Sequence, residues 1–139
     1  MVQLGLVVSQ FDKVGSVIDG MESRARDAAR DRGAEVVATV EVPGSYDTPL
    51  AADRLARRDD VDAVAVIGAV VEGRTEHDEV IADAAAQGLV DVSLERDTPV
   101  TFGVIGPGMS PAEAEARVDY GAQAVESAID LAEELPPPQ

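Results

Sequence analysis

The chain has 139 residues, 45% of them hydrophobic, and a formal net charge of −16 at pH 7. This length suits one substantial core, and the even composition indicates a single domain over residues 1–139. Cysteine is absent, which excludes disulfides, cysteine nucleophiles and thiolate zinc sites. No stretch approaches the roughly 20 apolar residues that span a bilayer, and no basic segment precedes the short apolar run at the amino terminus. We therefore expect a soluble, cytoplasmic protein.

The strands are predicted from apolar runs at residues 2–9, 35–42, 61–71 and 99–105. Between them, apolar residues recur at helical spacing. The first helix ends at Gly33, a short second helix begins near Thr48, and a third runs from the first turn around His77 to Asp97. Alternating strands and helices imply a parallel sheet covered on both faces, which is a three-layer, four-stranded α/β fold.

After the fourth strand, residues 106–109 are rich in glycine and proline, and we expect them to break the chain. Ser110 and Glu113 have the capping-box spacing that opens a helix, and we expect one long last helix with residues 136–139 as a frayed tail. This helix carries a core stripe and additional alanines. The additional alanines are small enough to allow close packing against another subunit: Ala114, Ala116, Ala124 and Ala128.

The charge is one-sided, with 27 acidic against 11 basic residues, and Lys13 is the only lysine. Such a surface repels phosphate backbones and anionic membranes, so we expect neither nucleic acid nor a membrane as partner. Many carboxylates with few lysines and aromatic residues are typical of proteins from extreme halophiles. Concentrated salt shortens the Debye length to about 3 Å at 1 M and relieves the self-repulsion. An acidic protein from a mesophile is the alternative.

Ligands of open α/β sheets bind at the carboxyl ends of the strands, where four turns of this chain are expected to meet. Phe11 and Tyr46 lie in two of these turns and do not belong to the apolar face of a helix or strand. Their rings are therefore candidates for binding a flat heterocyclic ligand. Alternatively, each ring plugs the edge of the sheet.

His77 is the only histidine, in the first turn of the helix that follows the third strand. The positive end of the helix dipole disfavours an imidazolium there, so His77 is a candidate neutral base. The alternative is that His77 is an exposed surface residue with no functional role. A single imidazole surrounded by carboxylates does not supply the ligands that zinc prefers. The Gly-x-Ser-x-Gly motif of serine hydrolases is absent, which argues against that chemistry. We expect no metal.

Gly73, Arg74 and Thr75 supply backbone N–H groups, a guanidinium and a hydroxyl at the same helix start, which suits an anion. Thr75 could instead only cap the helix and Arg74 only pair with a surface carboxylate. Arg117 is a second basic candidate, with pairing to Glu113 as its alternative reading.

Five segments in order, at residues 9–12, 42–50, 68–80, 99–103 and 116–121, resemble the lumazine synthase family in its short archaeal form. The resemblance spans nearly the whole chain. It implies a flavodoxin-like four-stranded parallel sheet and a homo-oligomer, either a pentamer or a shell of sixty subunits. The chain departs from the family at Asp12, Tyr46 and Asp47, where asparagine, phenylalanine and glutamate are commoner, and it has no lysine at Ala122.

The family's site residues are carried over by position. Phe11 resembles the ring that stacks on the pyrimidine substrate, and His77 the proton-transfer histidine. Arg117 resembles an arginine that reaches the phosphate from a neighbouring subunit, and Phe102 a ring wall also donated across the interface. The remaining substrate-binding positions contact the ribityl chain and ring, line that pocket, or bind phosphate: Ser45, Tyr46, Asp47, Val70, Val71, Gly73, Arg74 and Thr75.

The resemblance implies an enzyme of riboflavin biosynthesis with two small-molecule substrates and no cofactor. It would condense 5-amino-6-(D-ribitylamino)uracil with 3,4-dihydroxy-2-butanone 4-phosphate to 6,7-dimethyl-8-ribityllumazine, phosphate and water. Two alternatives stay open: the paralogous archaeal riboflavin synthase, and a non-catalytic shell protein that binds anions or flavin.

Overall fold

The structure is a computed structural model that describes residues 1–10, 17–71 and 77–136. Its strands form one parallel sheet in the order β2-β1-β3-β4. They are β1 (Gln3–Ser9), β2 (Glu35–Val42), β3 (Ala63–Val71) and β4 (Val100–Met109). The helices are α1 (Val17–Asp31), α2 (Thr48–Ala56), α3 (His77–Arg96), α4 (Pro111–Glu115) and α5 (Tyr120–Glu134), and a 3₁₀ turn, η1, covers Ser45–Asp47. The predicted alternation of strands and helices is confirmed.

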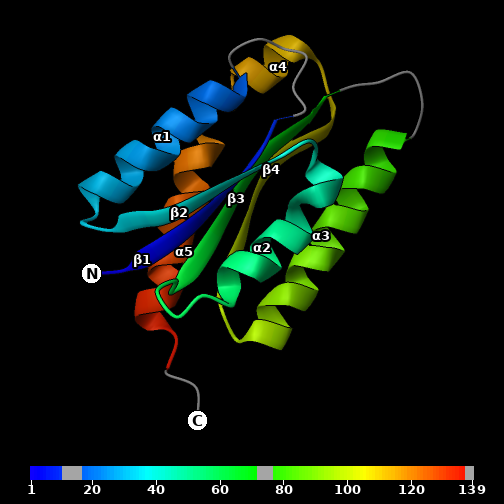
Figure 1. The fold of residues 1–139 in the computed structure, drawn as a ribbon. Coiled ribbons are helices and arrows are strands. Elements are labelled where there is room, and N and C mark those ends of the chain that lie inside the picture. Colours follow the sequence, from blue (N-terminus) through cyan, green and yellow to red (C-terminus); the bar gives the residue numbers. More distant parts are fainter. Residues whose placement is uncertain (11–16, 72–76, 137–139) are drawn as a thin grey trace.

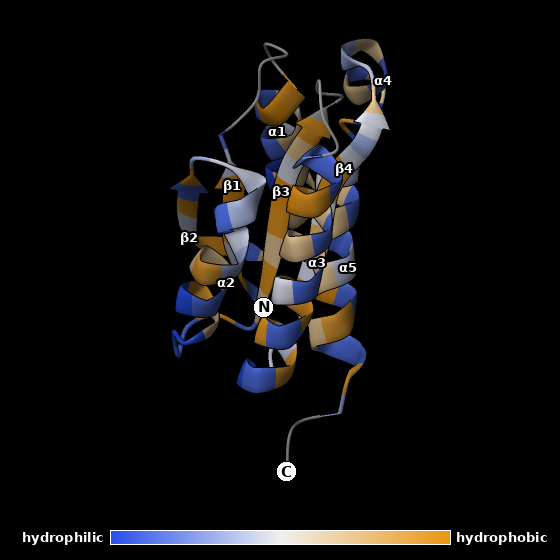
Figure 2. Ribbon diagram, turned by 90° about the vertical axis from the view of Figure 1, so that its right-hand side faces the viewer, coloured by the Kyte–Doolittle hydropathy of each residue, from blue (hydrophilic) through white to orange (hydrophobic). Residues whose placement is uncertain are grey.

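The sheet is the middle of three layers, with α1 and α5 on one face and α2 and α3 on the other (Figure 1). One hydrophobic cluster joins the sheet to α1 and α5, and a second joins it to α2 and α3. The central strand β3 is buried from Ala63 to Val70. Figure 2 shows β3 as largely hydrophobic, whereas the helices alternate between hydrophobic and hydrophilic residues. A parallel strand covered on both faces has no polar side, which explains its continuous apolar sequence.

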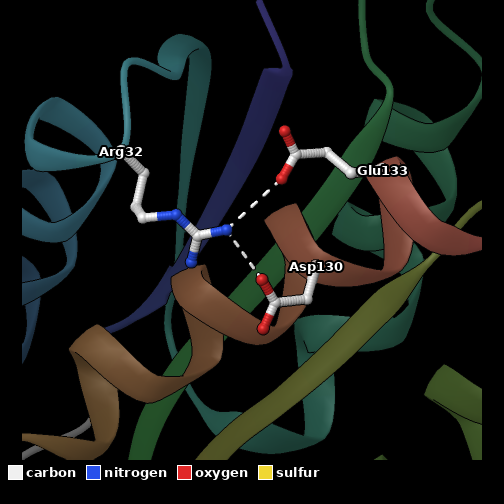
Figure 3. A network of polar contacts seen from close by, with 3 residues as sticks. All are labelled: Arg32, Asp130 and Glu133. Carbon is white, nitrogen blue, oxygen red and sulfur yellow. Dashed lines mark hydrogen bonds and ion pairs between the residues drawn. The ribbon is translucent and has the colours of Figure 1, made fainter.

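Helices α1 and α5 pack at backbone contact. A Cβ atom at Gly121 would lie 2.1 Å from the carbonyl oxygen of Met21, so only glycine fits there. Beyond the end of α1, the guanidinium of Arg32 donates to Asp130 at 2.7 Å and to Glu133 at 3.3 Å, both on α5 (Figure 3). The hydrogen bond to Asp130 is the main reason that the pKa of Arg32 is raised. These charges are exposed, so the close backbone packing holds the two helices together more than the ion pairs do.

The prediction that residues 106–109 break the chain is wrong. Strand β4 continues to Met109, which pairs with Val71 after a register shift that begins at Ala69. Gly106 and Gly108 have φ angles of +96° and +80°. Glycine adopts such angles without a Cβ clash, so the strand bends through an irregularity instead of ending.

The prediction of one long last helix is also wrong, because a turn at residues 116–119 separates α4 from α5. Contacts with α1 hold this turn: Val118 lies against Gly20, and Asp119 pairs with Arg24. The capping box of Ser110 and Glu113 is confirmed at the start of α4.

Most of the additional alanines pack within this chain and are not exposed for another subunit, contrary to the prediction. Three of them belong to the core of this chain, where they are 0–5% exposed: Ala114, Ala124 and Ala128. Ala116 is exposed, but it lies in the turn before α5. In the described ranges, none of the helices is both long and apolar enough to cross a bilayer.

Candidate functional site

The carboxyl ends of the parallel strands lie at one edge of the sheet (Figure 1). The turn after β2 carries Ser45, Tyr46 and Asp47, the helix after β3 begins at His77, and the segment after β4 leads to Arg117. Helix α3 packs against η1, which brings the second and third of these connections together. The structure therefore gathers most of the described candidate residues at the edge where open α/β sheets bind ligands.

The turn after β2 is held by its own hydrogen bonds. The backbone N–H of Asp47 donates to the Gly44 carbonyl at 3.1 Å, and the Gly44 N–H donates to the Asp47 carboxylate, also at 3.1 Å. The buried hydroxyl of Thr48 donates to the Ser45 carbonyl at 2.8 Å. Ser45 itself is only 5% exposed. These bonds stabilise the conformation of the turn.

Tyr46 has 64% of its surface exposed, although it lies between the buried Ser45 and the start of α2. The interpretation that this ring plugs the edge of the sheet is therefore wrong. An exposed aromatic ring on a fixed turn is available to contact a flat ligand. Asp47 is exposed beside it.

Val70 is 7% exposed and packs into the core on the α2 and α3 side. Its carbonyl oxygen lies so close to β4 that a Cβ atom at Gly106 would approach it to 2.0 Å. This contact fixes the end of β3 against β4. Val71 follows in the strand, paired with Met109.

His77 is the first residue of α3 and is exposed. The expectation that it lies in the first turn of this helix is confirmed. Asp78 and Glu79 share that turn, so the positive end of the helix dipole has acidic neighbours. An exposed imidazole at the carboxyl edge of the sheet is able to exchange protons with a ligand held there.

Arg117 does not lie within a helix as predicted but in the turn before α5. Its guanidinium donates to the sulfur of the buried Met109 at 3.6 Å and lies 3.7 Å from the Glu113 carboxylate. The expected pairing with Glu113 is thus present, but both side chains are about half exposed. The Ser110 backbone N–H, more than Arg117, lowers the pKa of Glu113. A loose, exposed ion pair leaves the guanidinium able to bind a phosphate.

Phe102 lies away from the edge that holds the other candidates. It pairs with Val66, four residues before Val70, which is roughly 13 Å along the strand at about 3.3 Å per residue. Phe102 is 44% exposed and lines an open cavity of about 420 Å³ between β4 and α5. Tyr120 and Leu131 line the same cavity. No periodic pattern in the sequence indicated this cavity, because it depends on how α5 crosses the outer strand.

Phe11, Gly73, Arg74 and Thr75 lie outside the described residues. Two residues that contact the turn were not predicted: Ser9 at the end of β1 and Gly68 in β3. A glycine inside a valine-rich strand is the signal that would have identified Gly68, because it marks a close approach. In the part of the chain that the structure describes, acidic and histidine side chains form no cluster suited to a metal ion.

The family model for 6,7-dimethyl-8-ribityllumazine synthase matches residues 1–135 of the chain. Proteins of that name from Halobacterium salinarum and Halorubrum lacusprofundi are 65% and 66% identical over 97% of this chain, and the matches cover 100% and 99% of their own length. One from Methanocaldococcus jannaschii is 45% identical over 97% of this chain and 94% of its own. The first two organisms are halophilic archaea, in agreement with the acidic composition.

Proposed function

The chain belongs to the 6,7-dimethyl-8-ribityllumazine synthase family, and from this we propose how its residues divide the reaction between them. The enzyme acts in riboflavin biosynthesis, condensing 5-amino-6-(D-ribitylamino)uracil with 3,4-dihydroxy-2-butanone 4-phosphate to 6,7-dimethyl-8-ribityllumazine, phosphate and water. The family match and the named relatives favour this activity over riboflavin synthase or a non-catalytic shell protein.

The chemistry sets three requirements. An amine attacks a ketone to form an imine with loss of water, phosphate leaves, and the second ring closes with loss of a further water. The enzyme must therefore orient two substrates, bind a phosphate and move protons. We assign the proton transfers to His77, on the support of its exposed position at the carboxyl edge of the sheet.

The pyrimidine and its ribityl chain are assigned to the turn after β2 and the end of β3. The support is the hydrogen-bonded turn, which presents Tyr46 and Asp47 to solvent beside the buried Ser45. Val70 and Val71 lie at the end of β3, on the same edge of the sheet, and family resemblance assigns them to the lining of this pocket. Phe11, in the connection after β1, is assigned the stacking position by family resemblance.

The phosphate of the second substrate is assigned to Gly73, Arg74 and Thr75 together with Arg117. A helix start binds phosphate through its N–H groups, and a guanidinium adds charge-assisted hydrogen bonds. The exposure of Arg117 and its loose pairing with Glu113 support the second part of this assignment.

We further propose that each site is shared between two subunits of a homopentamer, alone or within a sixty-subunit shell. The main support is the position of Phe102, which lies about 13 Å along the strand from the end of β3, too far to line the proposed pocket at the carboxyl edge of its own chain. Phe102 also lines an exposed cavity, where a neighbouring subunit would bring its own carboxyl edge. A closed ring of head-to-tail contacts gives every interface the same composite site.

Cytoplasmic location, and the absence of nucleic-acid and membrane partners, are part of the same proposal. The net charge of −16 supports the absence of nucleic-acid and membrane partners, because it disfavours binding to polyanions and anionic lipid surfaces.

The substitution Arg117→Ala tests the phosphate assignment in an assay of lumazine formation from the two purified substrates in molar KCl. We expect the KM for the butanone phosphate to rise by about 10-fold or more, because a charge-assisted hydrogen bond is worth about 1.5–3 kcal/mol. The KM for the pyrimidine should change little.

Arg58→Ala is the matched control, because Arg58 is a similarly exposed arginine paired with Asp60, just before the amino end of β3. It should change neither constant. An equal rise in both KM values for Arg117→Ala would refute the phosphate role.

A further inference from the structure

Two buried hydroxyl groups meet between the end of β1 and the turn after β2. The Ser45 hydroxyl donates to the Ser9 hydroxyl at 3.4 Å. Ser9 is completely buried and Ser45 is 5% exposed. Water does not replace a partner at such depth, so losing one hydroxyl leaves the other without its hydrogen bond.

Gly68 in β3 makes room for this pair. The register between β1 and β3 pairs Val8 with Ile67, which puts Ser9 next to Gly68. A Cβ atom at Gly68 would lie 3.0 Å from the Ser9 Cβ and 3.1 Å from the Ser45 Oγ. Glycine within a strand costs stability relative to residues with side chains. A glycine is explained at position 68 because the Ser45 side chain occupies the space beside it, against Ser9. We call this space the Ser45 slot.

The slot determines where the exposed part of the turn points. Ser45 is the buried residue of η1, and the next two residues, Tyr46 and Asp47, are exposed. Ser45, the first residue of η1, is bonded through its side chain to Ser9 of the sheet and through its carbonyl to Thr48 at the start of α2. A shift of Ser45 would therefore move Tyr46 and Asp47 together.

We propose that Ser9 and Gly68 are positioning residues, which hold Ser45 in its slot and thereby orient Tyr46 and Asp47 for the pyrimidine substrate. The inference rests on the proposed function for its substrate, but the seating of the turn is a property of the free protein. Neither Ser9 nor Gly68 needs to touch the substrate for this role.

Two variants test the proposal in the full-length protein in molar KCl. Ser9→Ala removes the hydroxyl that accepts from Ser45, and Gly68→Ala fills the slot. In each, we expect the KM for the pyrimidine to rise by about fivefold or more, the equivalent of one buried hydrogen bond at about 1 kcal/mol. The kcat and the KM for the butanone phosphate should stay within about twofold, because the hydroxyl pair lies in the pyrimidine half of the proposed site.

Ile129→Val is the control for a purely structural effect. Ile129 is buried in the core on the other face of the sheet, and this substitution typically costs about 0.5–1.5 kcal/mol. It should lower the melting temperature about as much as Ser9→Ala and leave the KM for the pyrimidine unchanged. If Ile129→Val raised this KM as much as Ser9→Ala, the positioning role would be refuted.

The rate of hydrogen exchange at the backbone amides of residues 44–48 measures how firmly the turn is held, and it requires no substrate. We expect faster exchange there in Ser9→Ala and Gly68→Ala, and unchanged exchange in Ile129→Val. Unchanged exchange in the first two variants would overturn the positioning role. A wild-type enzyme that formed no lumazine would overturn the proposed substrate instead, so the two failures are distinguishable.

Discussion

We expect the variant His77→Ala to fold normally and to lose about 100-fold in kcat. General acid–base groups contribute about 10²–10⁴-fold, and the intrinsic reactivity of an amine with a ketone places this enzyme at the low end. The fold should persist because His77 is an exposed residue at the first position of α3. Initial rates at saturating concentrations of both substrates, with circular dichroism in molar KCl, measure both quantities.

Gln87→Ala is a suitable control for the His77 variant, since Gln87 is an exposed residue farther along α3 that donates to Asp91 on the same helix. It should retain the wild-type kcat. The proton-transfer role would be untenable if His77→Ala kept the wild-type kcat at saturation.

The largest loss of stability is expected for Gly121→Ala. The added Cβ atom would lie 2.1 Å from the Met21 carbonyl oxygen and within 3 Å of two further Met21 backbone atoms. Backbone cannot rotate away as a side chain can, so α1 and α5 must separate. Overpacking costs about 1–3 kcal/mol, and a clash with backbone falls at the upper end. Alanine has a higher helix propensity than glycine, which offsets about 1 kcal/mol of this loss of stability. The free energy of unfolding should therefore fall by about 2 kcal/mol.

Gly20→Ala gives the matched comparison on the facing helix. Its Cβ would lie 3.3 Å from a methyl group of Val118, which is a side chain and able to shift. This variant should be as stable as the wild type or slightly more stable, since helix propensity favours alanine over glycine by about 1 kcal/mol. Denaturant unfolding of both variants in molar salt decides between them. Equal stability of the two would show that α1 and α5 do not pack at backbone contact.

Local signals in the sequence were sufficient for the elements themselves. The continuous apolar run that ends at Val71 predicted a strand covered on both faces, and β3 is the buried centre of the sheet. Gly33, with a φ of +69°, follows α1 as expected of a helix-ending glycine. Both signals act through neighbours in the sequence, so they can be recognised without knowing the tertiary structure.

The two wrong boundaries both depend on contacts between distant segments. Residues 106–109 have the composition of a turn, but β3 pairs with them through Met109 and keeps them in the sheet. The last helix has helical spacing throughout, but α1 holds Val118 and Asp119 in a turn. Pairing and packing of this kind override local propensity.

The same reasoning applies to the candidate site. Residue type and position were enough to predict that Ser45, Tyr46 and His77 follow strands at one edge of the sheet. The burial of Ser45 beside the exposed Tyr46 could not be predicted, because it depends on Ser9 and Gly68 from two other strands. Alanines on α5 suggested an intersubunit surface by composition, but the packing of α5 on the sheet buries Ala124 and Ala128 in the core.

Mixing His77→Ala and Arg117→Ala subunits tests the shared site most directly. When the butanone phosphate is well below its KM, His77→Ala alone should keep about 1% of the wild-type rate and Arg117→Ala alone about 10% or less. If each site takes His77 from one subunit and Arg117 from its neighbour, random assembly at equal ratio gives about one interface in four with both residues intact. We therefore predict that co-assembled subunits regain about a quarter of the wild-type rate per subunit. Activity no higher than the mean of the two separate variants, in assemblies shown to contain both, would contradict a site shared between subunits.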